Sequence, residues 1–133
     1  MSKNGKIIII GGGASGLAAA LAAAKECGGR CVTVLERLDR VGKKLLATGN
    51  GRCNLTNRNA APEHYHSADT ARLADILERT PPDAVLDFFG EMGLLCDTQA
   101  DGRVYPYCYQ ASMVLDVLRA ALERAGVDVA CSC

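Results

Sequence analysis

The sequence lacks an excess of charge of either sign. Its 15 Lys and Arg residues balance 15 Asp and Glu residues, so the formal net charge of the 133-residue chain is zero. Proteins that bind nucleic acid or anionic membranes concentrate basic residues, whereas here they are scattered. The composition therefore argues against both kinds of partner. With 49% hydrophobic and 23% charged residues, it indicates one folded domain with its own core.

The chain also lacks a C-x-x-C pair, although it contains seven cysteines. Disulfide frameworks of small secreted domains use an even number of cysteines, and structural zinc sites place them in closely spaced pairs. His64 and His66 have no third metal ligand near them in the sequence. We therefore expect no metal site, and we expect a cytoplasmic protein whose cysteines serve as small apolar residues.

A long uninterrupted hydrophobic segment is missing as well. Residues 7–24 carry no charge, and a quick scan would take them for a signal peptide or a membrane helix. Three consecutive glycines break the run after four isoleucines, and its second half is mostly alanine, which is only weakly apolar. The run is better explained as a strand buried on both faces, a glycine turn and the first part of a helix.

The glycine turn follows the pattern G-x-G-x-x-G, between a strand predicted over residues 6–10 and a helix predicted from Ala14. Gly11 permits the tight turn, Gly13 lets a pyrophosphate approach the backbone, and Gly16 lets the helix pack closely on the strand. The helix also directs free N–H groups and the positive end of its dipole at the phosphates. The context therefore predicts a dinucleotide site.

A carboxylate stands at the distance that such a site requires. A second strand is predicted over residues 31–35, and Glu36 follows it directly, 20 positions after Gly16. Dinucleotide-binding folds use a carboxylate at this point to accept hydrogen bonds from the ribose hydroxyl groups. The alternative is a βαβ unit that binds no nucleotide.

Residues 37–57 show neither strand nor helix periodicity and are rich in Gly, Lys, Arg, Thr and Asn. A long ordered loop in a compact domain is usually functional. Glycines allow close approach of the backbone, and basic side chains offset phosphate charge. We therefore predict contact with a polyanionic, hydrogen-bond-rich ligand. The alternative is a solvated polar loop between domains.

The rest of the chain predicts a mostly helical excursion over residues 58–110, followed by a return to the sheet. The expected elements are a helix over 69–79, a helix from a Thr80 cap to Gly93, a hairpin of 94–99 and 103–106, a helix from Gln110 or Ala111 to Gly126, and a strand over 127–131. We expect Pro106 to keep the end of its strand at an edge of a sheet or outside it.

Right-handed crossovers favour pairing of the three parallel strands in the order third, first, second. The strand over 127–131 would then form an exposed apolar edge, and we expect the chain to self-associate through it.

Five segments, taken together, resemble FAD-dependent oxidoreductases of the aminoacetone-oxidase-like (BaiN-like) family. The resemblance covers nearly the whole chain and is carried by residues 11–17, 34–37, 42–46, 48–57 and 102–106. Residues 48–57 are the most specific segment, because ordinary flavoproteins with two dinucleotide-binding domains do not share it. The resemblance implies an α/β, Rossmann-like FAD-binding domain, a parallel sheet with flanking helices. Because family members continue well beyond this length, it also implies that residues 1–133 are the N-terminal part of that domain.

The resemblance implies FAD in the glycine turn, a small-molecule substrate, and NAD(P)H as a candidate electron donor. It further implies that Ser15 binds the pyrophosphate, that Arg37 lies beside the adenine, and that Val129 meets the adenine through its backbone. The predicted cofactor-binding residues are Gly11, Gly13, Ala14, Ser15, Gly16, Glu36, Arg37, Gly42, Lys43, Lys44, Thr48, Gly49, Asn50, Gly51, Arg52, Cys53, Asn54 and Val129.

The sequence names no catalytic acid, base or nucleophile. Cys53 stands beside Arg52 in a glycine loop, where a cation lowers a thiol pKa, but no second cysteine forms a redox pair with it. A cysteine packed beside the cofactor is therefore the better interpretation. The leading hypothesis is a flavin-dependent oxidoreductase. The alternatives are an FAD-binding module without turnover and, against the evidence of the glycine-rich basic loop, an NAD-dependent dehydrogenase.

Overall fold

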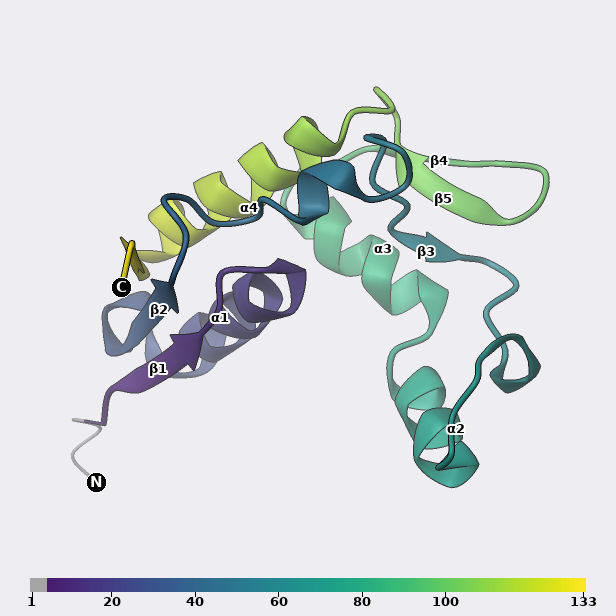
Figure 1. Ribbon diagram of the computed structural model, residues 1–133, viewed down its shortest axis with the longest axis horizontal. Coiled ribbons are helices and arrows are strands. Elements are labelled where there is room, and N and C mark those ends of the chain that lie inside the picture. Colours follow the sequence, from purple (N-terminus) through teal and green to yellow (C-terminus); the bar gives the residue numbers. More distant parts are fainter. Residues whose placement is uncertain (1–4) are drawn as a thin grey trace.

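A computed structural model describes residues 5–133 as two sheets with four α-helices around them (Figure 1). In chain order the elements are β1 (Ile7–Ile10), α1 (Ala14–Cys27), η1 (Gly29–Cys31), β2 (Val32–Glu36), η2 (Leu45–Ala47), β3 (Thr56–Asn57), η3 (Pro62–His64), α2 (Thr70–Arg79), α3 (Pro82–Glu91), β4 (Cys96–Thr98), β5 (Arg103–Pro106), α4 (Ala111–Ala125) and β6 (Asp128–Cys131). The strand-turn-helix-strand unit predicted at the start is present, with bounds shifted by one or two residues.

The parallel sheet has the order β1-β2-β6, with β2 in the middle. Val34 of β2 lies opposite Ile9 of β1 and opposite Val129 of β6. The predicted order of third, first, second strand is therefore wrong. The right-handed rule fixes the hand of each crossover but leaves open on which side of the pair the third strand arrives.

Packing between α1 and α4 accounts for the observed order. When two right-handed crossovers advance in the same direction, both helices lie on one face of the sheet. Leu17 and Ala20 of α1 are fully buried in one core with Leu118 and Leu122 of α4. Small alanines on α1 let the backbone of α4 come close, because they add little bulk between the two helices.

The other face of this sheet is open. Side chains alternate along a strand, so Ile8 and Ile10 point away from the face that α1 and α4 cover. Ile8 is 50% exposed and Ile10 87% exposed. The prediction that this strand is buried on both faces is therefore wrong, because no described element covers that face or pairs with the free edge of β1. Strand β6 is an edge of the sheet, as expected, and β1 is the other edge.

A second part of the molecule carries the short antiparallel sheet β3-β5-β4 together with α2 and α3. Strand β3 was not predicted, because two residues are too few to show periodicity. Pro106 ends β5 opposite Cys96 of β4, whereas β3 pairs only with Arg103 and Val104, so this end of β5 has a partner strand on one side only, as predicted. The expected cap is wrong: Thr80 ends α2, and Pro81 is the N-cap of α3.

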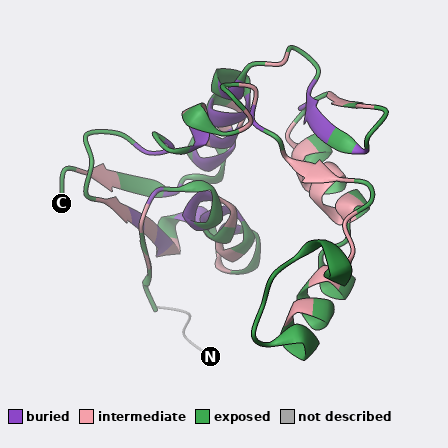
Figure 2. Cartoon of the chain, turned by 45° about the vertical axis from the view of Figure 1, so that its right-hand side comes forward, coloured by how far each residue is buried: buried purple, intermediate pink, exposed green. Residues whose placement is uncertain are grey.

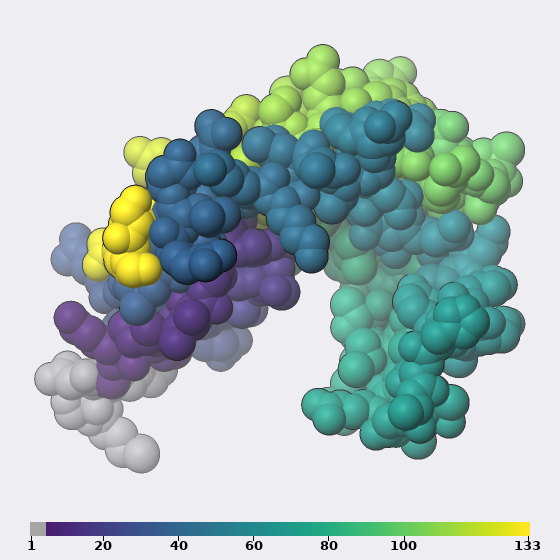
Figure 3. Space-filling model, viewed as in Figure 1, coloured from purple at the N-terminus to yellow at the C-terminus, as the bar shows by residue number. Residues whose placement is uncertain are grey.

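Burial is strongest where α1, α4 and β2 meet, and weak along α2 and α3 (Figure 2). In the view of Figure 3 a hollow separates the part around α1 from the part that holds α2. No helix within residues 5–133 is long and apolar enough to cross a membrane.

Candidate functional site

The glycine turn between β1 and α1 has the geometry that its pattern requires. Gly11 has φ +99°, and its N–H donates to the carbonyl oxygen of Leu35 at 2.8 Å. A Cβ on Gly16 would lie 1.9 Å from the carbonyl oxygen of Gly11, so only glycine fits there. A Cβ on Gly13 would meet nothing within 4 Å. The turn is closed toward the sheet and open at Gly13, where a ligand has room.

Gly12, a variable position of the G-x-G-x-x-G pattern, connects the turn to two other segments by hydrogen bonds. Its N–H donates to Oε2 of Glu36 at 2.7 Å, and its carbonyl oxygen accepts from the N–H of Gly42 at 2.7 Å. A Cβ on Gly12 would lie 2.4 Å from Cγ1 of Val41. The run of three glycines was the signal that this position also needed glycine.

The carboxylate of Glu36 lies directly beside the turn. Its second oxygen, Oε1, accepts from the N–H of Leu38 at 2.8 Å. The hydrogen bonds from the backbone of Leu38 and Gly12 hold the pKa of Glu36 below its ordinary value. The carboxylate is therefore ionised at neutral pH, and each oxygen retains a lone pair for a ligand hydroxyl.

The first turn of α1 is free to receive an anion. Gly13 is its N-cap and supplies no side-chain cap, and Ala14 and Ser15 are exposed. The first N–H groups of a helix have no partner within the helix, and they carry the positive end of the helix dipole.

The long loop after β2 supplies cations of different availability. The Nζ of Lys43 pairs with Oδ1 of Asp39 at 2.7 Å, whereas Lys44 and Arg37 are exposed. The charge of Lys43 is already partly compensated, so Lys44 and Arg37 are the freer cations.

Gly42, in the same loop, has φ +75°, and a Cβ there would lie 2.2 Å from Leu115.

The glycine loop, defined as residues 48–54, is tightly folded. Gly49, Asn50, Gly51 and Cys53 all have positive φ angles between 56° and 79°. The N–H groups of Gly51 and Cys53 both donate to the carbonyl oxygen of Thr48, at 3.0 and 2.9 Å. The Thr48 hydroxyl donates to the carbonyl oxygen of Leu45 at 2.6 Å. The loop therefore has a defined shape rather than that of a solvated linker.

Cys53 is only 5% exposed, and burial raises the pKa of its thiol. The reactive-thiolate interpretation has no support in this geometry, because a thiolate needs an electropositive and accessible environment. Asn54 is exposed, and its Nδ2 donates to the carbonyl oxygens of Thr56 and Val104, both at 3.4 Å.

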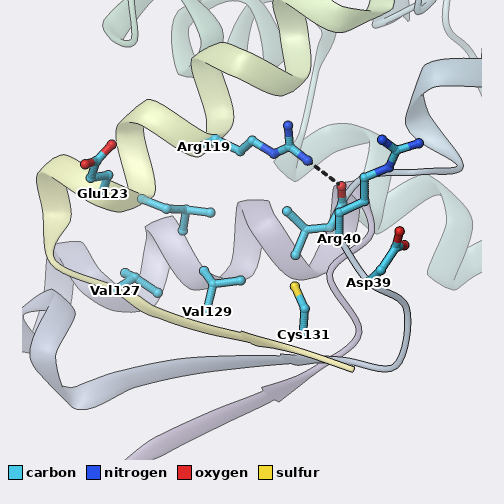
Figure 4. Close-up of a pocket in the computed structure, with 9 residues that line it drawn as sticks. Asp39, Arg40, Arg119, Glu123, Val127, Val129 and Cys131 are labelled. Atoms are coloured by element: carbon cyan, nitrogen blue, oxygen red, sulfur yellow. Dashed lines mark hydrogen bonds between the residues drawn. The ribbon is translucent and has the colours of Figure 1, made fainter. Parts of the chain in front are cut away.

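Val129 lies apart from the glycine turn, on the wall of a pocket of about 370 Å³ between α4, β6 and the loop after β2. Figure 4 shows the side chains of Val127, Val129 and Cys131 directed to the same side, beneath α4. Arg119, which the sequence analysis did not single out, crosses the pocket and donates to the carbonyl oxygen of Val41 at 3.2 Å.

No group of three or more His, Cys, Asp or Glu residues within residues 5–133 is arranged to hold a metal ion. The fold and the site together define a Rossmann-like nucleotide-binding domain: a glycine turn at the carboxyl end of a parallel strand, a free helix N-terminus and a carboxylate on the next strand.

The chain belongs to the HI0933-like protein Rossmann domain family, whose pattern matches residues 5–133. It is 43% identical over 124 residues to the 3-dehydro-bile acid delta(4,6)-reductase of Clostridium scindens, covering 93% of this chain and 30% of that protein. It is 30% identical over 130 residues to the ribosomal RNA dihydrouridine synthase of Haemophilus influenzae, covering 97% and 31%. These matches confirm the family resemblance drawn from the sequence.

Among solved structures, the crystal structure of THI4 from Thermovibrio ammonificans matches 97% of this chain and 39% of its own, with a TM-score of 0.59 and 21% identity. That match confirms the Rossmann-like fold. The chain spans about 30% of the length of the curated relatives that it matches.

Proposed function

We propose that this chain binds the adenosine diphosphate half of FAD and forms the cofactor-binding part of a flavin-dependent oxidoreductase. The observation that carries the proposal is the position of Glu36, whose carboxylate is hydrogen-bonded to the glycine turn at Gly12. This contact supports the proposal because the proposed ribose and pyrophosphate contacts would then lie side by side, as a dinucleotide requires.

The residues present fit this cofactor. Open space at Gly13 admits a pyrophosphate, and the free N–H groups of Ala14 and Ser15 are placed to donate to it. Glu36 would accept from the ribose hydroxyls, with Arg37 exposed beside it for the adenine and Lys44 exposed for the phosphates. The backbone of Val129 is our candidate adenine contact because the family resemblance implies it. Strand β6, which carries Val129, pairs with β2 and ends with Cys131 opposite Glu36.

When bound, FAD would supply the two-electron chemistry. The chain's own residues would orient the cofactor through the turn and through Glu36. The glycine loop and the buried Cys53 would form a wall that keeps water away. Cys53 takes no part in electron transfer in this proposal.

For the electron donor we propose NAD(P)H, and for the acceptor an unsaturated small molecule or base. The names of the two relatives, a delta(4,6)-reductase and a dihydrouridine synthase, both describe products that have gained hydrogen. The zero net charge of this chain gives no separate support to an RNA substrate, because RNA binding depends strongly on basic residues.

A binding role without turnover is the second candidate. Its support is the open face of β1, where Ile8 and Ile10 leave the sheet uncovered on one side of the site. A domain with that face open can hold the adenosine end of the cofactor and leave the reactive ring in solvent.

The visible spectrum of the purified chain, with and without added FAD, tests both proposals. Retained flavin whose absorbance is bleached by NADH or NADPH without oxygen supports the oxidoreductase. Retained flavin that neither nicotinamide reduces supports binding without turnover. A chain that takes up no FAD, or that retains NAD instead, contradicts the proposed function.

A further inference from the structure

Arg52 is a half-buried cation that the described part of the chain leaves without an anion. It takes part in none of the ion pairs within residues 5–133. Its Nε donates to the carbonyl oxygen of Gly49 at 3.3 Å, and its guanidinium carbon lies 4.7 Å from the centre of the Tyr105 ring. These two contacts fix the direction of the side chain without neutralising its charge.

The Tyr105 ring, on which the Arg52 guanidinium lies, packs in turn against a second tyrosine. Tyr105 is buried in β5, and its ring centre lies 5.8 Å from that of Tyr109. The Tyr109 hydroxyl donates to the carboxylate of Asp97, and Nε2 of Gln99 donates to the same carboxylate oxygen at 3.0 Å. The hydrogen bond to Asp97 raises the pKa of Tyr109, while the charge of Arg52 acts in the opposite direction.

Tyr109 occupies a backbone conformation that tyrosine rarely adopts. Its φ angle is +55°, in the left-handed region, which is costly for a bulky side chain. Its N–H donates to the carbonyl oxygen of Pro106 at 2.8 Å. Two residues later, the N–H of Ala111 donates to the carbonyl oxygen of Gly51 at 2.8 Å. The strained turn is therefore joined directly to the glycine loop that carries Arg52.

The glycine loop follows the segment that is hydrogen-bonded to the turn. Gly42 is hydrogen-bonded to Gly12, and Figure 1 shows the chain crossing over the turn and continuing away from β2 toward β3 and β5. A dinucleotide bound with its adenosine at Glu36 and its pyrophosphate at Gly13 would extend its other half along this path, toward the glycine loop.

We propose that Arg52 stabilises the negative charge of the reduced flavin, and that Tyr105, Tyr109 and Asp97 are positioning residues that hold its guanidinium in place. The inference rests on the proposed function. With FAD bound, a hydride from a reduced nicotinamide would bring it two electrons and one proton, and the reduced ring would carry one more negative charge than the oxidised ring at neutral pH. A pre-oriented guanidinium binds that form more strongly than the oxidised one.

The first test compares how tightly the protein binds oxidised FAD and reduced FAD, through the midpoint potential of the bound cofactor. We expect Arg52→Gln to weaken binding of reduced FAD about tenfold more than binding of oxidised FAD, a fall in midpoint potential of about 30 mV for a two-electron couple. Arg52→Lys should restore part of the difference. Arg58→Gln is the matched control, because it removes a cation that already pairs with Asp83 and has no hydrogen bond or ion pair with the three positioning residues. An unchanged potential in Arg52→Gln, or an equal change in Arg58→Gln, overturns the proposal.

The second test needs no cofactor. We expect Tyr109→Phe to speed hydrogen exchange at the amides of Gly51, Arg52 and Cys53 about tenfold, since a hydrogen bond to a charged group is lost. Tyr107→Phe, which removes an exposed hydroxyl from the same segment, should leave these rates unchanged. Unchanged exchange in Tyr109→Phe overturns the positioning role. Failure to take up FAD contradicts the proposed function and the role of Arg52. The exchange result still decides whether Tyr109 and Asp97 hold the glycine loop in place.

Discussion

The carboxylate of Glu36 accepts a 2.7 Å hydrogen bond from the backbone N–H of Gly12, across 24 residues of chain. This contact joins the end of β2 to the glycine turn and places the predicted ribose acceptor beside the predicted pyrophosphate site. It also keeps the carboxylate in place before any ligand arrives, so little side-chain entropy is lost on binding.

Replacing Glu36 with Gln should therefore weaken binding of the adenosine half of the cofactor. We expect the dissociation constants for FAD and for ADP-ribose to rise roughly tenfold to a hundredfold, because hydrogen bonds to a charged acceptor are stronger than those to an amide. Fluorescence quenching of FAD and calorimetry with ADP-ribose measure the two. If ADP-ribose binds equally well to both proteins, Glu36 is not the ribose acceptor.

The same carboxylate should make stability depend on pH in the absence of cofactor. Because its pKa is lower in the folded protein than in the unfolded chain, Glu36 stabilises the fold above the ordinary carboxyl pKa. That contribution is lost as the pH falls through the ordinary and then the folded pKa. The difference in Tm between the natural protein and Glu36→Gln should thus stay constant from pH 7 to about pH 5 and shrink as the pH falls further. A difference that stays constant down to about pH 3 would contradict the assignment.

Two glycines of the turn should respond differently to alanine. Gly16→Ala places a methyl group 1.9 Å from the carbonyl oxygen of Gly11, and we expect a loss of about 2–3 kcal/mol in unfolding free energy. Gly13→Ala meets open space and has an extended backbone, so stability should change by under about 0.5 kcal/mol while FAD affinity falls. Urea unfolding with FAD titration separates the two effects. Equal destabilisation by both would contradict the geometry.

Strand β1 should drive self-association more strongly than β6. Its free edge consists of four isoleucines, with no charged residue or proline within the strand to block pairing. We expect Ile8→Lys to raise the monomer fraction measured by light scattering. Ile76→Lys on α2 is the control, because Ile76 is exposed to the same extent, 51% against 50%. If only substitutions in β6 restore the monomer, the edge predicted from the sequence is the correct one.

The cysteines should react at very different rates with a thiol reagent. Burial raises the pKa of Cys53 and removes it from solvent, whereas Cys108 is exposed. Mass spectrometry after brief alkylation with iodoacetamide should find Cys108 modified and Cys53 intact until the protein unfolds. Rapid modification of Cys53 in the native protein would reinstate a reactive thiolate in the glycine loop.

The sequence predicted a residue's role correctly where a local rule ties that residue type to one position. Gly16, Glu36 and Gly126 each follow from a local rule, and the structure gives Gly126 the left-handed conformation expected at the end of α4. The strand order did not follow from such a rule, because it depends on how closely α1 and α4 pack. Burial of β1 was misjudged for a similar reason. Four consecutive isoleucines are typical of a strand with both faces buried, but they do not show whether another element within residues 5–133 packs on each face.

The contacts that hold the Arg52 side chain in place could not be predicted from the sequence. Tyr109 and Asp97 lie in no motif, and Tyr105 lies in the segment 102–106, which carries the family resemblance but gave this side chain no role. Their contacts arise only when the hairpin β4–β5 folds against the start of α4. A tyrosine at a left-handed position gives no signal in the sequence, since the residues that usually mark such positions are glycine and asparagine.

The hydrogen bond from Gly42 to the carbonyl oxygen of Gly12 makes the turn and the first part of the long loop a single mechanical unit. Any ligand that damps motion in one must damp motion in the other, even where it touches only one of them. Cofactor binding should accordingly register as a collective stiffening from residue 11 to residue 54, and a substitution that loosens the loop should be felt as faster cofactor release at the turn.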